Sequence, residues 1–209
     1  MKKYGLIIVT MVFFLIVNTS YFWEGSLGFV AFPFFFLLIL IYLALGILLI
    51  KHLFLAFKEK FNNKLRLLSS VFLLFVLTTT FLKPNGLIDF SKLEAYDVLV
   101  AEREGAANCL TTLKLKDDFS FKERVVCFGV TETTGKYHIK NDTVYFDNVN
   151  KGRHYGEYYS FGIIRPSKFS KDGKRFDFVR YKSLSDTVGY EIWIVKNEMN
   201  KLDHKKSNH

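Results

Sequence analysis

Long apolar runs dominate the first 83 residues, whereas the rest of the chain alternates short apolar and polar stretches. The three runs extend roughly over residues 4–22, 29–50 and 67–82. A helix of about 20 apolar residues spans the roughly 30 Å hydrocarbon core of a bilayer. A buried core helix is the alternative for a single short run. Three runs without a polar face instead predict a transmembrane domain of three helices over residues 1–83.

The first run also has the basic start of a secretory signal peptide, because Lys2 and Lys3 precede it. Its end carries Tyr21, Phe22 and Trp23 in place of the small residues of a cleavage site. Such aromatic side chains favour the membrane–water interface. We therefore expect an uncleaved helix, and cleavage would leave the topology of the remaining chain unchanged.

Basic residues are concentrated on one side of the predicted membrane domain. Two precede the first run, and the segment after that run has none. Five lie between the second and third runs: Lys51, Lys58, Lys60, Lys64 and Arg66. The positive-inside rule places this basic side in the cytoplasm. The sequence therefore predicts an inner (cytoplasmic) membrane protein with a cytoplasmic N-terminus and a periplasmic or other extracytoplasmic C-terminal domain.

The connector over residues 51–61 alternates basic and apolar residues at helical spacing, which predicts an amphipathic segment on the inner membrane surface. The net charge is +9, but seven of the basic residues precede residue 67, where anionic lipids would attract them. The remaining excess is spread over a long segment. The charge therefore predicts membrane lipids as partners and argues against nucleic acid.

The pattern changes near residue 87 to apolar runs of five to eight residues, in which β-branched and aromatic residues alternate with charges. Pro84-Asn85-Gly86 marks the boundary, because it ends a helix and begins a turn. Eight strands are predicted: Tyr96–Glu102, Cys109–Leu115, Ser120–Val130, Lys136–Lys140, Thr143–Val149, Tyr158–Arg165, Arg175–Lys182 and Tyr190–Lys196. Successive hairpins, including one with a turn at Lys171–Lys174, favour an antiparallel meander. Such a meander closes into an up-and-down barrel because closure removes exposed edges.

These elements predict an α+β membrane protein with a single β-barrel-like domain over residues 87–200 and a disordered tail over residues 201–209. A β-sandwich is the alternative for the eight strands. A barrel of eight strands either holds one small ligand or is filled by its own side chains. The placement of Glu123 among the apolar positions of the third strand does not follow the period of two.

One hairpin resembles that of small lipocalin-like bacterial domains, which have a glycine-x-tyrosine, aspartate-threonine and phenylalanine pattern. The residues that match are Gly135, Tyr137, Asp142, Thr143 and Phe146. The Gly–Trp lead-in motif of lipocalins is not visible, because Trp23 and Trp193 lie elsewhere. In architecture alone, the chain is also similar to membrane effectors of cyclic-oligonucleotide antiphage systems. That resemblance implies a cytosolic barrel that senses a cyclic nucleotide, which is the alternative to the topology above.

The two cysteines are placed to meet across a hairpin. The Asp117–Phe119 turn pairs Leu115 with Phe121, and the continued register sets Cys109 opposite Cys127. Opposed residues of a non-hydrogen-bonded pair lie about 4.5 Å apart at Cα, which permits a disulfide. An oxidising compartment favours that bond, and two reduced, buried cysteines are the alternative. Neither cysteine has the neighbours of a zinc site, so no metal is predicted.

The candidate ligand-binding residues are Arg153, His154, Tyr155 and Tyr158, in a loop with two glycines that suits the mouth of a pocket. Ordinary loop composition is the alternative. No serine has the base and acid of a triad, and no glycine-rich phosphate loop appears, so neither catalysis nor a cofactor is predicted. We therefore expect the protein to bind a lipid, a small apolar ligand or an envelope partner. An enzyme acting on envelope lipid would need a polar cluster in the barrel mouth, which the sequence does not reveal.

Overall fold

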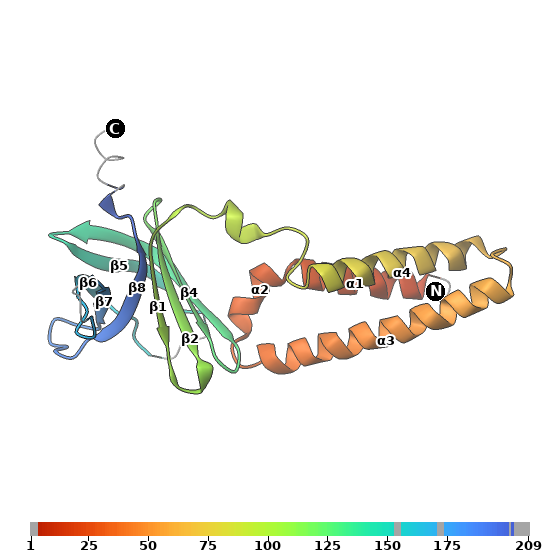
Figure 1. The fold of residues 1–209 in the computed structure, drawn as a ribbon, viewed down its shortest axis with the longest axis horizontal. Helices are drawn as coiled ribbons and strands as arrows, with labels where there is room; N and C mark the ends of the chain where they lie inside the picture. Colours follow the sequence, from red (N-terminus) through yellow and green to blue (C-terminus); the bar gives the residue numbers. More distant parts are fainter. Residues whose placement is uncertain (1–3, 153–155, 171–173, 201, 203–209) are drawn as a thin grey trace. The chain divides into compact units, whose positions relative to one another are not determined.

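The computed structural model describes residues 4–152, 156–170, 174–200 and 202. The chain forms two compact units, residues 1–24 with 30–93 and residues 25–29 with 94–209. The first unit is helical and the second is built on eight strands (Figure 1).

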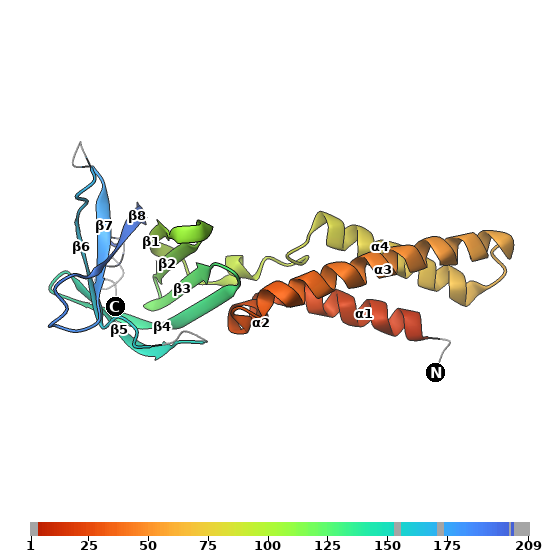
Figure 2. The ribbon, with the colours of Figure 1, turned by 90° about the horizontal axis from the view of Figure 1, so that it is seen from below.

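The helical unit is organised around its last long helix. Its helices are α1 (Gly5–Asn18), α2 (Ser20–Leu27), α3 (Ala31–Lys58) and α4 (Lys64–Leu82), followed by a 3₁₀ helix at Phe90–Leu93. The α4 helix packs against both α1 and α3 (Figure 1, Figure 2). Leu45, Leu73 and Val76 are buried between them. The outward-facing positions are also apolar, as expected of helices whose solvent is hydrocarbon: Ile47 is 69% exposed and Phe54 is 69% exposed.

Two helices, α3 and α4, are long and apolar enough to cross a membrane, and α1 with α2 forms a third candidate that is bent by 70°. The sequence predicted one continuous helix over residues 4–22. The break follows from polar side chains rather than from proline: Asn18 and Thr19 donate hydrogen bonds to the Phe14 and Leu15 carbonyls, each at 2.8 Å. Such back-bonding competes with the helical ladder and bends helices.

The α3 helix extends further than the sequence analysis predicted. We expected it to end near residue 50 and to be followed by a separate surface segment, but residues 51–58 continue the same helix. Neither glycine nor proline interrupts these residues, so nothing in the backbone stops the helix. Its 28 residues correspond to about 42 Å, longer than the roughly 30 Å hydrocarbon core.

The second unit is a closed antiparallel barrel in the order β1 to β8, as predicted, and closure excludes the sandwich. The strands are β1 (Asp97–Glu104), β2 (Leu110–Lys116), β3 (Ser120–Val126), β4 (Val130–Lys140), β5 (Thr143–Asn150), β6 (Phe161–Pro166), β7 (Phe176–Tyr181) and β8 (Tyr190–Asn197). The predicted third strand was too long, because residues 127–129 turn between β3 and β4. A side chain on Gly129 would lie 2.0 Å from the Gly28 carbonyl oxygen, so this turn requires glycine. The predicted hairpin turn at Lys171–Lys174 falls mostly outside the described residues.

The half of the barrel interior next to the β2–β3 and β4–β5 hairpin turns is filled by apolar side chains. Large examples with 0–1% exposure are Leu99, Leu115, Phe121 and Phe178. Two strand glycines make room for these rings: an added Cβ would lie 2.6 Å from the Phe121 ring at Gly135 and 2.4 Å from the Phe178 ring at Gly162. In the β4–β5 hairpin, Tyr137 pairs with Phe146 and Ile139 pairs with Val144.

Charges on the outer face of β1 to β4 form a continuous chain of ion pairs. Its members, in order, are Lys114, Asp97, Lys116, Glu94, Lys122, Glu132 and Arg124, with successive nitrogen–oxygen distances of 2.7–3.4 Å. Burial would raise the pKa of Asp97, but hydrogen bonds from Lys116 and Lys114 lower it below its ordinary value. The alternation of sign neutralises this face, so it is not a basic patch.

Candidate functional site

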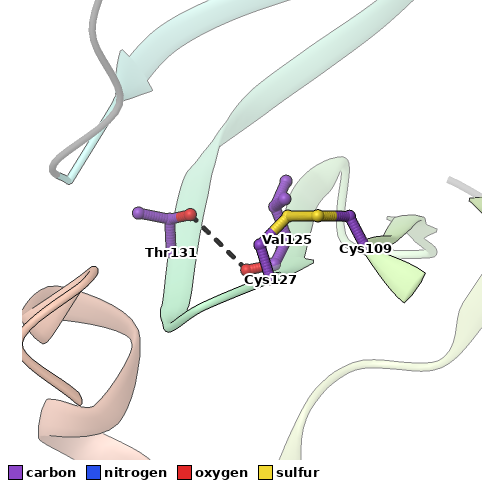
Figure 3. The surroundings of a disulfide bond; sticks show 4 residues. All are labelled: Cys109, Val125, Cys127 and Thr131. Atoms are coloured by element: carbon purple, nitrogen blue, oxygen red, sulfur yellow. Dashed lines mark hydrogen bonds between the residues drawn. A yellow bond between two sulfur atoms is a disulfide. The ribbon is translucent and has the colours of Figure 1, made fainter. Parts of the chain in front are cut away.

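The cross-strand disulfide lies at one end of the barrel, beside the start of β2 and the end of β3 (Figure 3). Leu113 pairs with Glu123 and Thr111 with Val125, as the predicted register requires. Cys109 and Cys127 follow this register, form the disulfide, and have Cα atoms 4.4 Å apart. Thr131 donates a 3.5 Å hydrogen bond to the Val125 carbonyl beside it. The bond therefore ties β2 to β3 at the end opposite their hairpin turn.

Of the four residues proposed for a ligand pocket, Arg153, His154 and Tyr155 lie outside the described residues, and their role remains a prediction. Tyr158 is described and lies inside the barrel with 7% of its surface exposed. Its ring stacks on Phe121 at 5.4 Å, and its hydroxyl donates to the Glu123 carboxylate at 2.5 Å. Tyr158 is therefore part of an interior polar cluster and not of an exposed loop.

A buried ion pair forms the centre of that cluster. Arg180 of β7 donates from Nη1 to Oε2 of Glu123 at 2.7 Å, and the two side chains are only 1% and 9% exposed. Because strand side chains alternate between faces, Arg180 shares the inner face with Phe178, and Glu123 shares it with Phe121. Removing two charges from water is costly unless they are paired and hydrogen-bonded, and here Tyr158 supplies the further hydrogen bond.

A second arginine extends the cluster toward the disulfide end of the barrel. The guanidinium of Arg103 lies 4.5 Å from the centre of the Tyr190 ring, and that of Arg180 lies 4.2 Å from the Tyr159 ring. Arg180 also lies 5.3 Å from Tyr190, so two cations and two rings form one alternating stack. Arg103 and both rings are partly exposed, whereas Arg180 is not. The stack therefore leads from solvent to the buried ion pair.

The electrostatics of the cluster favour one net positive charge. Burial, together with the nearby Glu123 carboxylate, raises the pKa of Tyr158 well above its ordinary value, so the hydroxyl stays protonated and donates. Burial alone would lower the pKa of Arg180, but Glu123 more than offsets this and raises it. Two guanidinium groups thus share one carboxylate. Nε of Arg180 is buried and has no hydrogen-bond partner among the described residues.

Sequence reasoning missed most of this cluster. The predicted register pairs Glu123 with Leu113, but the sequence analysis treated Glu123 as a departure from the period of two and did not assign it to the inner face. That departure was the visible signal. The partner of Glu123, Arg180, is 57 residues away, on a strand that is not its neighbour, so local patterning could not identify it. The cluster is also the polar group inside the barrel that the sequence analysis did not find. It contains no serine or cysteine nucleophile, and among the described residues no group of three or more His, Cys, Asp or Glu could hold a metal.

No family model, no curated protein and no solved structure matches this chain. The eight-stranded antiparallel barrel is consistent with the resemblance to small lipocalin-like domains that the Gly135–Phe146 hairpin carries. Function must therefore be argued from the molecule itself.

Proposed function

We propose that this protein is anchored in the inner membrane by its helices and presents the barrel on the extracytoplasmic side, as a binding domain for an anionic envelope molecule. The observation that carries the proposal is the disulfide between Cys109 and Cys127. Structural disulfides persist in the periplasm and outside cells and are rare in the reducing cytosol. The concentration of basic residues in the connector between α3 and α4 supports the same orientation independently.

The class of ligand follows from the charge of the interior cluster. Arg103 and Arg180 together exceed Glu123 by one positive charge, and the aromatic rings between them exclude water from one side of each guanidinium. A partly exposed guanidinium favours a carboxylate or phosphate, with which it forms charge-assisted hydrogen bonds. The half of the interior next to the β2–β3 and β4–β5 hairpin turns is filled by apolar side chains. We therefore assign binding to the opposite end, which carries the disulfide and where Arg103, Tyr159 and Tyr190 lie. An anionic lipid or an acidic group of an envelope protein has this chemistry.

The test of location uses two fusions placed after Leu202 of the full chain, one to alkaline phosphatase and one to green fluorescent protein. Active phosphatase with a dark fluorescent protein is the expected result. Cys109 and Cys127 should then resist maleimide labelling in intact cells until a reductant is added. Bright fluorescence with inactive phosphatase would refute the proposed location. That outcome would favour a cytosolic barrel that senses a cyclic nucleotide.

The test of ligand class uses the Arg103→Gln variant. A panel of soluble acyl anions and matched uncharged amphiphiles is titrated against the full-length chain in a Trp23→Phe background, with Trp193 fluorescence as the readout. Arg103→Gln should weaken binding of the anions about tenfold and leave the uncharged compounds unaffected. Lys182→Gln, which changes an exposed cation at the end of β7, is the matched control. Equal binding of charged and uncharged compounds would refute the assignment.

A further inference from the structure

A cavity of about 380 Å³ lies within the helical unit. It is formed where α1 ends, α3 begins and α4 ends, which is the side of the unit away from the basic connector. Its volume falls within the range of about 300–1,000 Å³ typical of small-molecule sites. Ile39 and Phe81 line it and are 56% and 76% exposed, so the cavity opens onto the outer apolar surface of the helices.

The walls of the cavity are apolar over most of their length and polar at one end. Phe13, Val17 and Leu38 are buried wall residues. Two polar residues of the lining lie near the helix ends: Ser20 lies just after the end of α1, and Thr80 lies in the last turn of α4. This arrangement matches an amphiphile whose chain lies among the apolar residues and whose polar group reaches the helix ends.

The depth of the cavity fits part of one lipid chain. On α3 its lining runs from Phe35 to Tyr42, which corresponds to about 10 Å along the helix axis. One leaflet of the hydrocarbon core is about 15 Å thick. Lys83 is exposed, directly follows α4 and precedes the lining residue Pro84, so this cation belongs to the helix end that borders the cavity.

We propose that the cavity binds one acyl chain of an anionic phospholipid in the outer leaflet. The ester region of that lipid lies at the helix ends, near Ser20 and Asn85, and Lys83 lies beside its phosphate. This site rests on the proposed membrane location of the helices, but it is separate from the barrel cluster and does not depend on ligand binding there.

The experiment uses the full chain in phosphatidylcholine nanodiscs that contain a phosphatidylglycerol with a photoactivatable group in its acyl chain. After irradiation, labelled peptides are mapped by mass spectrometry. We expect the label on cavity residues of α1 and α3. Ile39→Trp places a large ring across the open side and should reduce cavity labelling about tenfold. Ile47→Trp, at an exposed position of the same helix outside the lining, should leave it unchanged.

The headgroup is tested by comparing phosphatidylglycerol and phosphatidylcholine probes. The wild-type chain should prefer the anionic probe about fivefold, and Lys83→Gln should abolish that preference. Lys58→Gln is the control: it removes a cation at the C-terminal end of α3, away from the cavity, and should retain the preference for the anionic probe. Loss of preference in both variants, or in neither, would refute the assigned position of the headgroup.

Two outcomes separate this inference from the proposed function. If the chain inserts into nanodiscs but the label is spread evenly along exposed α3 positions, or Ile39→Trp and Ile47→Trp label alike, the lipid is merely annular and the site is refuted alone. If the chain does not enter nanodiscs and is extracted from native membranes by alkaline carbonate, the membrane location and this site are both refuted.

Discussion

The buried Glu123–Arg180 pair gives the sharpest prediction about the barrel. Glu123→Gln keeps the shape of the side chain but leaves the Arg180 guanidinium charged, 1% exposed and without its counter-ion. Removing one partner of a buried ion pair costs about 3–5 kcal/mol, and because Gln retains a hydrogen-bonding oxygen we expect a loss near 3 kcal/mol. Typical domains have only about 5–15 kcal/mol of stability. The substitution should therefore remove a large share of the stability of the barrel.

The assay is urea unfolding of the full chain in detergent micelles, followed by fluorescence. In a Trp23→Phe background, Trp193 of β8 is the remaining tryptophan and reports on the barrel alone. With a urea m-value of about 2 kcal/mol/M, the midpoint should fall by about 1.5 M. Lys136→Gln is the control: Lys136 and its partner Asp118 are both about half exposed, and we expect a loss of at most about 1 kcal/mol.

A complementary variant keeps the reasoning testable if Glu123→Gln does not fold. Replacing the whole set, with Glu123→Leu, Tyr158→Phe and Arg180→Met, removes both charges and the hydroxyl that bonds to them. Replacement of buried ion pairs by apolar residues of similar volume is often neutral or stabilising, and here the lost contacts of Arg180 with Tyr159 offset part of that gain. We expect stability within about 2 kcal/mol of the wild type. A midpoint unchanged by Glu123→Gln, or a triple variant less stable than the single one, would refute the argument.

Three further predictions concern stability. Cys109→Ser should lower the free energy of unfolding by about 2–4 kcal/mol under oxidising conditions and have no such effect in dithiothreitol; equal midpoints in oxidant would contradict this. Gly162→Ala forces a Cβ to within 2.4 Å of the Phe178 ring and should cost about 1–3 kcal/mol, measured by the same urea titration; a neutral result would mean that the ring moves freely. The depressed pKa of Asp97 means that its ion pairs contribute stability above the ordinary pKa of about 4 and lose it as the pH falls below that value. Asp97→Asn should therefore flatten the acid side of a stability–pH curve below about pH 4. An unchanged acid limb would show that Lys114 and Lys116 do not stabilise the ionised Asp97.

The sequence predicted those features of the barrel that depend on local turns. The Asp117–Phe119 turn determines the β2–β3 register and, through it, the opposition of the two cysteines. The alternation of charged and apolar residues likewise predicted eight strands. This alternation did not reveal the turn at residues 127–129, because the apolar residues Val125 and Val126 lead directly into the turn. The turn contains one typical turn residue, Gly129, and the need for glycine there comes from its close approach to Gly28, which the sequence does not show.

Features that depend on distant partners could not be predicted in this way. The pairing of Arg180 with Glu123 joins non-adjacent strands, and only closure of the barrel brings the two side chains together. The bend between α1 and α2 is a different case: the polar residues Asn18 and Thr19 are visible in the sequence, but neither is proline or glycine, and the run was interpreted as one helix. The cavity in the helical unit depends on three helix ends meeting, which no single apolar run indicates.

The two units place their polar groups in opposite ways, and this supports the proposed division between membrane and water. In the helical unit, Thr10, Ser69 and Ser70 are buried and donate to carbonyls of their own helices at 2.8–2.9 Å, while apolar side chains face outward. Hydrocarbon offers no hydrogen bonds, so a membrane helix must satisfy its polar groups internally. The barrel instead carries seven charged residues on its outer face, where they pair with one another. Charged side chains in such numbers are rare on a surface that faces hydrocarbon.

The choice between the two aqueous compartments then depends on the redox state of Cys109 and Cys127. A barrel in the cytosol would be exposed to thiols that reduce a disulfide of this kind, and the loss of about 2–4 kcal/mol would weaken a domain that already contains a buried ion pair. A barrel outside the cytosol retains the bond and its stability. The nucleotide-sensing alternative therefore requires the reduced protein to be the stable, functional form. The extracytoplasmic proposal requires the oxidised one, and quantifying free thiols in intact cells separates the two.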